Sequence, residues 1–293
     1  MAGLEEVNKE LFINSCEFSK VVNKLRSFFL EKSFIEVHTQ NRLSILAACE
    51  DPTTINKYTW EDQVWPLPQT GQMWLEYEML KNPEHPGFFC VSTSFRNEPN
   101  PMPGRHKKIF PMFEYELKGN MDDMMIMQSE LLEYLGYGKK DSFPCGNYLD
   151  VAKHYNTEEL EHEHEQKLYE EKGAVFFLKN FPNYTSPFWY MKRAETQDPE
   201  AAPSHSISNK IDVIMSGQET IGSAERSCDP EEMRKEFASI SEGKYAETIY
   251  NHFGKDRVDK EMDEFLKFDF FPRSGGGIGV SRLIRSMKME GLL

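Results

Sequence analysis

Apolar residues recur along the chain with two periods, and these periods predict where helices and strands lie. Over residues 18–29 the apolar positions return every three or four residues, which is typical of an amphipathic helix. Short apolar runs bounded by turn residues predict strands instead. On these criteria further helices are expected at residues 72–80, 121–135, 158–172 and 230–241, in a stretch reaching residue 267, and from residue 280. Strands are expected at residues 34–39, 88–95, 109–118, 174–178, 211–215 and 220–223, and in a Gly-rich segment before the last helix.

Interruptions of this pattern predict turns and loops. Residues 58–67 are typical of a hairpin that turns near Glu61 and Asp62. Residues 99–108 contain three prolines and a glycine, which exclude regular structure and predict a long loop between two antiparallel strands. The turn residues at 216–218 separate two short strands and predict a second hairpin, and the polar residues 192–208 predict a surface loop.

Length and composition favour one globular domain spanning residues 1–293. The chain is 39% hydrophobic and 28% charged, which is ordinary for a folded protein of this size. It contains no apolar run of about 18 residues and no signal-type N-terminus, so we expect a cytoplasmic protein that does not enter a membrane. A net charge of -14 opposes non-specific binding of nucleic acid, although it leaves room for a local basic patch. Five well-separated cysteines favour free thiols over a disulfide framework or a zinc site.

A first set of candidate functional residues surrounds the proline-containing loop. Arg96 and Glu98 stand at the end of a predicted strand, where alternation places both side chains on one face of the sheet. A guanidinium fork suits a phosphate group, and Arg105 and His106 add two further donors. Phe110 offers an aromatic plane. A solvated basic loop beside a core strand is the alternative interpretation of the same residues.

A second candidate is the glycine cluster near the C-terminus. Residues 274–282 (Ser-Gly-Gly-Gly-Ile-Gly-Val-Ser-Arg) permit close approach of the backbone, at Gly279 for example, to a ligand. They also place Arg282 in the first turn of a helix. The cluster matches neither the P-loop nor the dinucleotide fingerprint, and a simple tight turn is the alternative.

Two acidic residues and one arginine complete the candidates. Asp212 and Glu219 flank the predicted hairpin turn, so that their carboxylates can converge on a magnesium ion, or else both face water. Arg226 suits bidentate binding of a carboxylate, or pairing with a surface glutamate. Residues 161–165 (Glu-His-Glu-His-Glu) do not predict a metal site, because histidines two apart on a helix face different directions; a solvated charged face is favoured.

The order of these segments resembles that of class II aminoacyl-tRNA synthetases. Residues 95–114, which include Phe-Arg-Asn-Glu, Arg-His and Phe-Pro-Met-Phe-Glu, resemble motif 2, and residues 275–282 resemble motif 3. Residues 18–39 occupy the place of motif 1, the dimer interface of the family. The resemblance implies an α+β fold with a mostly antiparallel sheet of six to seven strands flanked by helices, and a homodimer. It also implies a partly helical insertion at residues 119–208, between motif 2 and the metal-binding hairpin.

Within the class the chain is most similar to aspartyl and asparaginyl enzymes, through residues 34–39, 69–72, 184–188 and 219–226. This resemblance implies ATP and Mg²⁺ as cofactors, the metal being held by Asp212 and Glu219. The implied ATP-binding residues are Arg96 for the α-phosphate, Glu98 for the adenine amino group, His106 and Arg282 for the outer phosphates, Phe110 for stacking on adenine, and Arg105, Glu219 and Gly279. Arg96 and Arg282 are also the implied catalytic residues. The implied amino-acid site is formed by Glu50, Gln72, Glu76, Glu114, Ser223 and Arg226, with Glu114 receiving the ammonium group and Arg226 the far end of the substrate.

Other positions bear on the reaction. Leu75 stands where aspartyl enzymes carry a lysine, and Glu76 follows it, as in asparaginyl enzymes. Only about seventeen residues precede the first predicted helix, too few for the anticodon-binding domain of these synthetases. Ser281 replaces their usual acid before the motif 3 arginine, and this segment is similar to ammonia-dependent asparagine synthetase, a class II relative that acts without tRNA.

These resemblances imply three functional hypotheses. The preferred one is an amide ligase that converts aspartate and ATP to β-aspartyl-AMP, from which ammonia releases asparagine and AMP. The second is a compact asparaginyl-tRNA synthetase paralogue that transfers asparagine to tRNA or another acceptor, with tRNA disfavoured by the acidic charge. The third is a non-catalytic sensor of amino acid and ATP.

Overall fold

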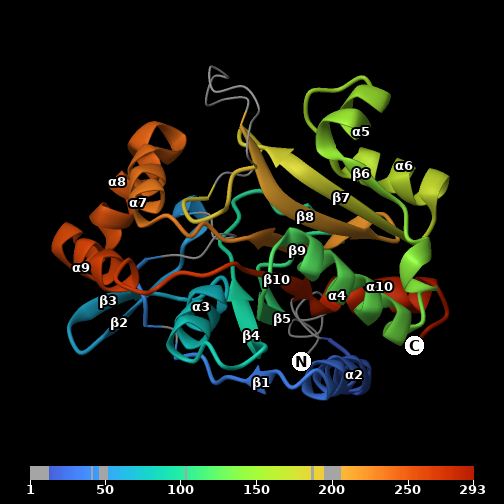
Figure 1. The fold of residues 1–293 in the computed structure, drawn as a ribbon, viewed down its shortest axis with the longest axis horizontal. Coiled ribbons are helices and arrows are strands. Elements are labelled where there is room, and N and C mark those ends of the chain that lie inside the picture. The colour runs from blue at the N-terminus through green and yellow to red at the C-terminus, as the bar shows by residue number, and fades with distance from the viewer. Residues whose placement is uncertain (1–12, 41, 46–51, 103, 186–187, 195–205) are drawn as a thin grey trace, which may run out of the picture.

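One large mixed sheet organises the molecule. The computed structural model describes residues 13–40, 42–45, 52–102, 104–185, 188–194 and 206–293. Within them, eight strands are ordered β1–β4–β5–β10–β9–β8–β7–β6 (Figure 1). These strands are β1 (Ile35–Glu36), β4 (Gly87–Phe95), β5 (Ile109–Lys118), β6 (Cys145–Asn147), β7 (Val175–Pro182), β8 (Ile207–Met215), β9 (Gln218–Glu225) and β10 (Arg273–Gly279). Only the edge pairs, β1 with β4 and β6 with β7, are parallel.

The α+β class is confirmed, and the sheet has one strand more than the six to seven expected. The additional strand is β6, which sequence patterns missed because Cys-Gly-Asn is short and carries no apolar alternation. The strand expected at residues 34–39 contracts to the two residues of β1. The predicted hairpin exists as β2 (Lys57–Trp60) and β3 (Gln63–Pro66), with Glu61 and Asp62 at positive φ in its turn.

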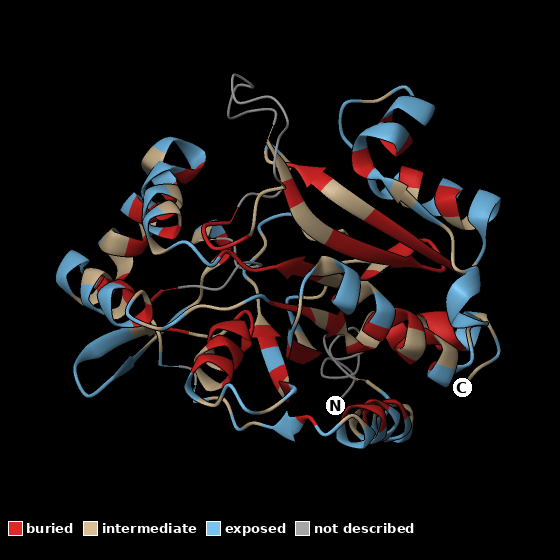
Figure 2. Cartoon of the chain, in the orientation of Figure 1, coloured by how far each residue is buried: buried red, intermediate tan, exposed pale blue. Residues whose placement is uncertain are grey.

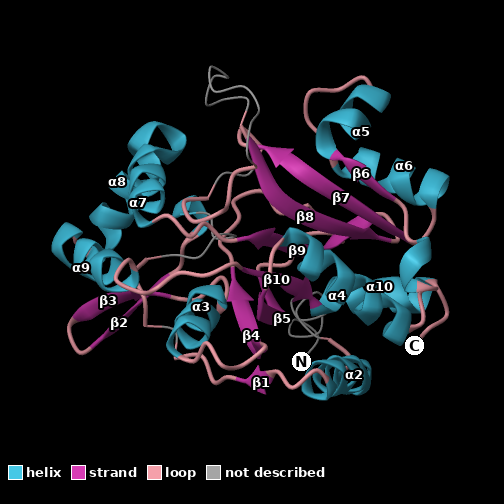
Figure 3. Cartoon of the chain, in the orientation of Figure 1, coloured by secondary structure: helices cyan, strands magenta, loops and turns pink. Residues whose placement is uncertain are grey.

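Helices surround the sheet on several sides (Figure 3). Three helices, α2 (Ser15–Glu31), α4 (Met121–Leu135) and α10 (Val280–Met289), pack against one face, whereas α3 (Gln72–Lys81) lies beside β4 and β5. At one end α7 (Pro230–Ser239), α8 (Lys244–Phe253) and α9 (Lys255–Phe265) form a group with β2 and β3; at the other, α5 (Tyr148–His154) and α6 (His162–Lys172) adjoin β6 and β7 (Figure 1). Short 3₁₀ turns cover Pro52–Thr54, Lys140–Ser142 and Ile240–Gly243.

Several predicted boundaries shift. The helix expected at 158–172 begins at His162, the one at 230–241 ends at Ser239, and α5 was not predicted. Part of the loop expected at 192–208 lies outside the described residues. The segment 119–208 contributes β6 and β7 to the main sheet, and its status as an insertion in a single domain stays a prediction. Within the described ranges, no helix has the length and apolarity needed to cross a bilayer.

The first helix illustrates how sequence periodicity becomes core. The Asn14 side chain caps α2 by accepting hydrogen bonds from the backbone N of Cys16 at 3.0 Å and of Glu17 at 3.1 Å. Every buried residue of α2 belongs to the predicted apolar stripe, and the ring of Phe29 lies 5.1 Å from that of Phe113 in β5. Figure 2 shows the result, a helix buried on its sheet side and exposed outside. This packing covers one face of the sheet with helices, so that face forms part of the hydrophobic core.

Strand alternation leaves the opposite face for chemistry. In β5, Phe113 and Tyr115 point into the core with the helices α2, α4 and α10, so Glu114 and Glu116 point to the other face. All four side chains are fully buried. Buried carboxylates are costly unless they are paired, so this face must supply partners for them.

A β-bulge between β8 and β9 changes which side chains point to this same face of the sheet. Asp212 pairs with Gly222 and Ile214 pairs with Glu219, which makes Thr220 the extra residue in β9. Residues opposite each other in a ladder share a face, so the bulge places Glu219 on the same face as Asp212. In an uninterrupted ladder, residues 219 and 222 would lie on opposite faces.

Candidate active site

Two adjoining cavities open on the chemical face of the sheet. The first has a volume of about 470 Å³, the second about 660 Å³. Both are lined by Arg96, Glu219, Gly222 and Gly277, so they form one continuous site. We refer to them as the nucleotide cavity and the amino-acid cavity, according to the predicted residues that each contains.

The nucleotide cavity brings together distant parts of the chain. All residues predicted to bind ATP line it: Arg96, Glu98, Arg105, His106, Phe110, Glu219, Gly279 and Arg282. They come from the loop after β4, from β5 and β9, from the end of β10 and from the start of α10. Their proximity is therefore produced by the fold and not by sequence spacing.

Several polar side chains of the nucleotide cavity are partly exposed and make few contacts with other residues. His106 Nδ1 lies 2.9 Å from Glu98 Oε2, and these side chains are 32% and 26% exposed, so the pair can open to solvent or to a ligand. The guanidinium of Arg96 lies over the ring of Phe110 at 5.5 Å from its centroid. Arg282 Nη1 donates a 2.6 Å hydrogen bond to the backbone oxygen of Glu219. Such contacts orient cations toward the cavity and leave them able to exchange partners.

The Asp212 and Glu219 carboxylates converge over Gly222. A Cβ built on Gly222 would lie 2.9 Å from Glu219 Oε1 and 3.6 Å from Asp212 Oδ1, so only glycine leaves both oxygens in place. Asp212 Oδ1 is buried without a hydrogen-bond partner, while Oδ2 accepts a 2.8 Å hydrogen bond from Lys210 Nζ. Burial raises the pKa of Asp212 to about 7, against the effect of Lys210. Burial also raises the pKa of Glu219, but the nearby cations Arg282, Lys210, Arg96 and Arg105 act together against it and hold this pKa below the usual range.

These carboxylates fit a hard divalent cation. Oxygen ligands suit Mg²⁺, which usually takes one or two carboxylates and fills its remaining positions with phosphate and water oxygens. The buried, unpartnered Oδ1 of Asp212 is an available ligand. No cluster of three or more His, Cys, Asp or Glu side chains suited to a metal occurs in the described part of the chain.

The glycine cluster forms the floor of both cavities as strand β10. Residues 275–277 line the amino-acid cavity, and Gly277 and Gly279 line the nucleotide cavity. A Cβ on Gly276 would lie 2.7 Å from the backbone oxygen of Gly222, and one on Gly277 would lie 2.6 Å from Met112 Cε. The glycines therefore permit close packing of the strands and leave space for a ligand. The predicted helix follows directly from Val280, with Arg282 in its first turn.

The amino-acid cavity contains only part of its predicted set. Gln72, Ser223 and Arg226 line it. Glu50 lies outside the described residues. The Ser223 hydroxyl is engaged on the helix side of the sheet, since it donates to the Ile211 backbone oxygen and accepts from Gln128 Nε2, both at 2.8 Å. Glu76 and Glu114 are fully buried and do not line the cavity, and their expected contact with a substrate stays a prediction.

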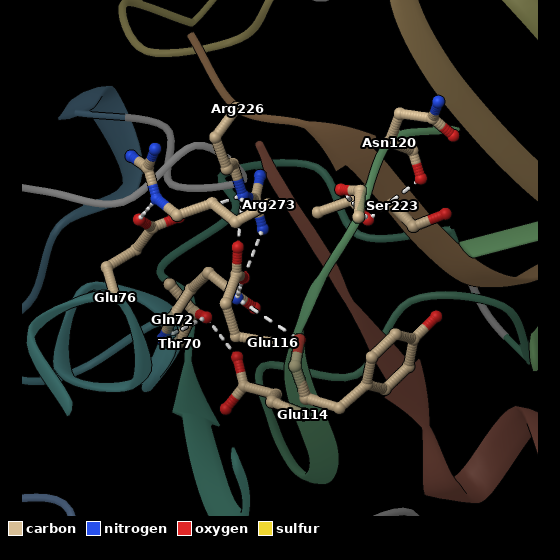
Figure 4. A network of polar contacts seen from close by, with 12 residues as sticks. Thr70, Gln72, Glu76, Glu114, Glu116, Asn120, Ser223, Arg226 and Arg273 are labelled. Atoms are coloured by element: carbon tan, nitrogen blue, oxygen red, sulfur yellow. Dashed lines mark hydrogen bonds and ion pairs between the residues drawn. The ribbon is translucent and has the colours of Figure 1, made fainter. Parts of the chain in front are cut away.

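Glu76 instead belongs to a buried cluster of alternating charge (Figure 4). Its carboxylate lies 2.9 Å from Arg226 Nε and 2.5 Å from Arg273 Nε. Arg226 also makes a two-pronged contact with Glu116, at 3.2 Å from Nε and 3.1 Å from Nη2, and Gln72 Nε2 donates to the same carboxylate. Arg226 is only 2% exposed. The expected surface-glutamate alternative for Arg226 is thus replaced by two buried partners.

The electrostatics of this cluster are balanced. Two arginines face two glutamates, so the group is formally neutral and each charge has an opposite neighbour. Burial raises the pKa of Glu116 to about 8, and Arg226 acts in the opposite direction. Arg226 is therefore held rigidly at the cavity wall.

Glu114 occupies a separate cradle of neutral donors. Thr70 Oγ1 and Ser92 Oγ donate to its carboxylate, and the backbone N of Gly71 donates to Oε2 at 2.9 Å. These contacts enclose the carboxylate under the start of α3. Its role as receiver of a substrate ammonium group stays a prediction, and it requires an exchange of these donors.

Sequence reasoning missed several charged residues of the site. Glu116 had an available signal, because it follows Glu114 by two positions and must share its face. Arg285 lines the nucleotide cavity and lies one helical turn after Arg282, which was also readable. Lys210, Glu165 and Arg273 lacked a local signal, since only the folded sheet brings them to the site.

Comparison with known proteins identifies the family and the fold. The family model described as tRNA synthetases class II (D, K and N) matches residues 5–290. The lysine–tRNA ligase of Shewanella piezotolerans is 24% identical over 330 residues, which cover 96% of this chain and 63% of that protein. The chain thus spans less than two thirds of the length of this relative.

Solved structures of similar fold include two asparaginyl-tRNA synthetases. The enzyme from Pyrococcus horikoshii complexed with asparaginyl-adenylate has a TM-score of 0.72 and 21% identity, covering 92% of this chain and 64% of that chain. The Entamoeba histolytica enzyme in complex with asparaginyl-adenylate has a TM-score of 0.71 and 18% identity, covering 94% and 63%. At these identities the likeness establishes the fold.

Proposed function

Since this chain belongs to the class II tRNA synthetases of the D, K and N type, we propose that it uses ATP to activate a small acidic or amide amino acid as its adenylate. The observation that carries the proposal is the pair of adjoining cavities with a shared wall of Arg96, Glu219, Gly222 and Gly277. An amino-acid carboxylate and the α-phosphate of ATP must meet at such a boundary. Arg96 lies at that boundary and is the natural ligand of the reacting phosphate.

Catalysis in this proposal is positional and electrostatic. A carboxylate oxygen of the amino acid attacks the α-phosphorus, the bond to the β-phosphate oxygen breaks, and pyrophosphate leaves. Arg96 and Arg282 neutralise charge on the phosphates, and no protein nucleophile is needed. Asp212 and Glu219 would hold Mg²⁺, which supplies charge neutralisation and orientation of the phosphate oxygens.

Charge in the amino-acid cavity supports aspartate or asparagine over lysine. Among the described lining residues Arg96, Lys210, Arg226 and Lys244 are basic, and Glu219 is the acidic one. A lysine side chain would bring another cation into this environment, whereas a carboxylate or amide finds donors there. The sequence similarity to lysine–tRNA ligases therefore does not fix the substrate.

We propose ammonia as the acceptor. Aspartate placed with its α-carboxylate at Arg226 would direct its β-carboxylate toward Arg96 and the α-phosphate. Ammonia then attacks the β-carbonyl carbon, the bond to AMP breaks, and the nitrogen loses a proton, giving asparagine and AMP. Ser281 and the glycine pattern before Arg282 support this assignment through their similarity to asparagine synthetase.

A second candidate is activation of asparagine for transfer to tRNA. It is supported by the pairing of Glu76 with Arg226, because a charge-neutral cluster suits an uncharged side-chain amide. Dimerisation through the region of α2 and β1 remains a prediction for both candidates, and sedimentation velocity would measure it.

The products distinguish the candidates. The chain is incubated with ATP, Mg²⁺, ammonium and aspartate, with and without tRNA, and the products are identified by mass spectrometry. Free asparagine and AMP in equal amounts, independent of tRNA, are expected. If asparagine alone drives ATP–pyrophosphate exchange and aspartate does not, the ammonia assignment is wrong and the second candidate stands. If neither amino acid drives exchange, the proposed activation itself fails.

A further inference from the structure

A carboxylate of the acidic helix α6 contacts two residues of the nucleotide cavity. Glu165 accepts a hydrogen bond from Nη2 of Arg105. Its Oε2 also accepts a 2.9 Å hydrogen bond from the backbone N of Glu219. Only 13% of the Arg105 side chain and 18% of the Glu165 side chain are exposed, so solvent screens this ion pair less than a surface pair. One carboxylate therefore connects the loop after β4 to the hairpin that carries the candidate metal ligands.

The position of α6 is fixed by its packing on the β8–β9 turn. Gly217 in this turn has φ of +80°, and the Cα of Gln166 would lie only 3.4 Å from a Cβ added there. The helix thus sits directly on a turn that admits no side chain. The same packing places Glu165, the neighbour of Gln166, beside Glu219.

Arg105 has a second possible partner in the nucleotide cavity. It lines this cavity together with Arg282 and Arg285, where the outer phosphates of ATP belong under the proposed function. Arg105 contacts Glu165 through Nη2, so a phosphate that uses this nitrogen in a bidentate contact competes with Glu165 for it. The backbone N of Glu219 is under no such competition, since its hydrogen bond to Glu165 does not involve the nucleotide.

Building on the proposed function, we propose that Glu165 is a positioning residue of the nucleotide site. It holds the Arg105 guanidinium at the cavity while ATP is absent, yields it to an outer phosphate when ATP binds, and keeps the Glu219 backbone in place throughout. The acidic helix thereby sets a balance between ATP affinity and the alignment of the reacting groups.

Glu165→Gln tests this role with a change of charge alone. Glutamine can still accept both hydrogen bonds, but it no longer holds Arg105 as an ion pair. Both the Kd of a non-hydrolysable ATP analogue and the KM for ATP in pyrophosphate exchange should fall about threefold to tenfold. The kcat should fall as well, because Arg105 and Glu219 are less firmly placed. Calorimetry gives the Kd, and exchange kinetics give KM and kcat separately.

Glu163→Gln is the matched control. It makes the same charge change on the same helix, two positions earlier, on a side chain that is 62% exposed and outside the cavity. Its Kd, KM and kcat should stay within about twofold of the unmodified chain, as for an exposed surface pair. Should Glu165→Gln fail to fold, Glu165→Asp withdraws the carboxylate by one methylene, and the same fall in KM and in kcat is expected from it.

The outcomes separate this inference from the proposed function. If the unmodified chain binds no ATP analogue, the proposed function fails and the inference fails with it. If it binds the analogue and Glu165→Gln behaves like Glu163→Gln, the inference alone fails. Weaker ATP binding together with a lower Tm in Glu165→Gln also overturns it, since that result describes a purely structural residue.

Discussion

The two halves of the candidate site hold their charges in different ways. In the nucleotide cavity the contact between Glu98 and His106 is partly exposed, and both side chains can change partner. Beside the amino-acid cavity the charged side chains Glu76, Arg226, Glu116 and Arg273 are buried, and each forms an ion pair with another of the four. The first arrangement suits a highly charged ligand that brings its own counterions. The second suits recognition of a small molecule by a rigid wall.

The difference between the two halves should have its largest effect on the free energy of unfolding. Replacing Glu76 with alanine leaves two buried arginines with one acidic partner fewer, and it should lower the free energy of unfolding by about 3–5 kcal/mol. The matched change in the nucleotide half, Glu98→Ala, removes a side chain that is 26% exposed and should cost less than about 1 kcal/mol. Urea unfolding measures both. Equal losses would mean that the buried cluster is not the rigid element described here.

In activity the larger effect belongs to the nucleotide half. Arg96→Ala should reduce ATP–pyrophosphate exchange at least about 100-fold, because it removes a fixed donor to the reacting phosphate. Its Tm should change little, since Arg96 makes a ring contact and no buried ion pair among the described residues. Arg234→Ala, a change in the exposed pair with Asp263, is the control. Retained exchange in Arg96→Ala would remove the basis for the phosphate assignment.

The boundary between the halves can be probed through its glycine. In Gly222→Ala the new Cβ meets Glu219 Oε1 at 2.9 Å and must displace this carboxylate. The Mg²⁺ concentration for half-maximal exchange should rise about tenfold, as when a metal ligand is misoriented. Gly279→Ala, whose Cβ meets its nearest neighbour at 3.7 Å, should leave the Mg²⁺ requirement unchanged. A metal titration of both variants decides the point, and identical curves would count against the hairpin as a metal site.

The smallest expected effect concerns base recognition. Glu98→Gln keeps an acceptor for His106 but loses the negative charge of the carboxylate, so the KM for ATP should rise by about threefold. The preference for ATP over GTP should weaken in parallel if Glu98 contacts the adenine amino group. Competition between the two nucleotides gives this ratio. If the preference for ATP over GTP does not change, Glu98 contacts His106 and does not contact the adenine amino group.

Sequence patterns were informative where chemistry and local periodicity coincide. The residues of the nucleotide cavity were identified because arginines, an aromatic residue and glycines stand at the ends of recognisable strands and helices. The hairpin acids were found for the same reason, although the bulge at Thr220 that turns Glu219 to the correct face has no sequence signature.

The amino-acid half was less predictable. Glu76 and Glu114 were expected to touch a substrate, yet their surroundings are set by residues far along the chain, such as Arg273 for Glu76 and Ser92 for Glu114. Whether a buried carboxylate faces a ligand or a neighbouring side chain depends on tertiary packing, which one-dimensional patterns do not contain.

Two strand registers are possible for the β8–β9 hairpin, and Gly217 in the turn determines which one forms. A three-residue turn would give an unbroken ladder with residue 219 opposite residue 215. It would direct the Glu219 carboxylate into the hydrophobic core. The observed two-residue turn places Ser216 at φ of +46° and Gly217 at +80°, a geometry that glycine favours and that commits the chain to the bulge. Register selection thus depends on a residue that contacts no reactant. A shift of strand register can therefore point a catalytic side chain to the wrong face of the sheet without any change to that residue.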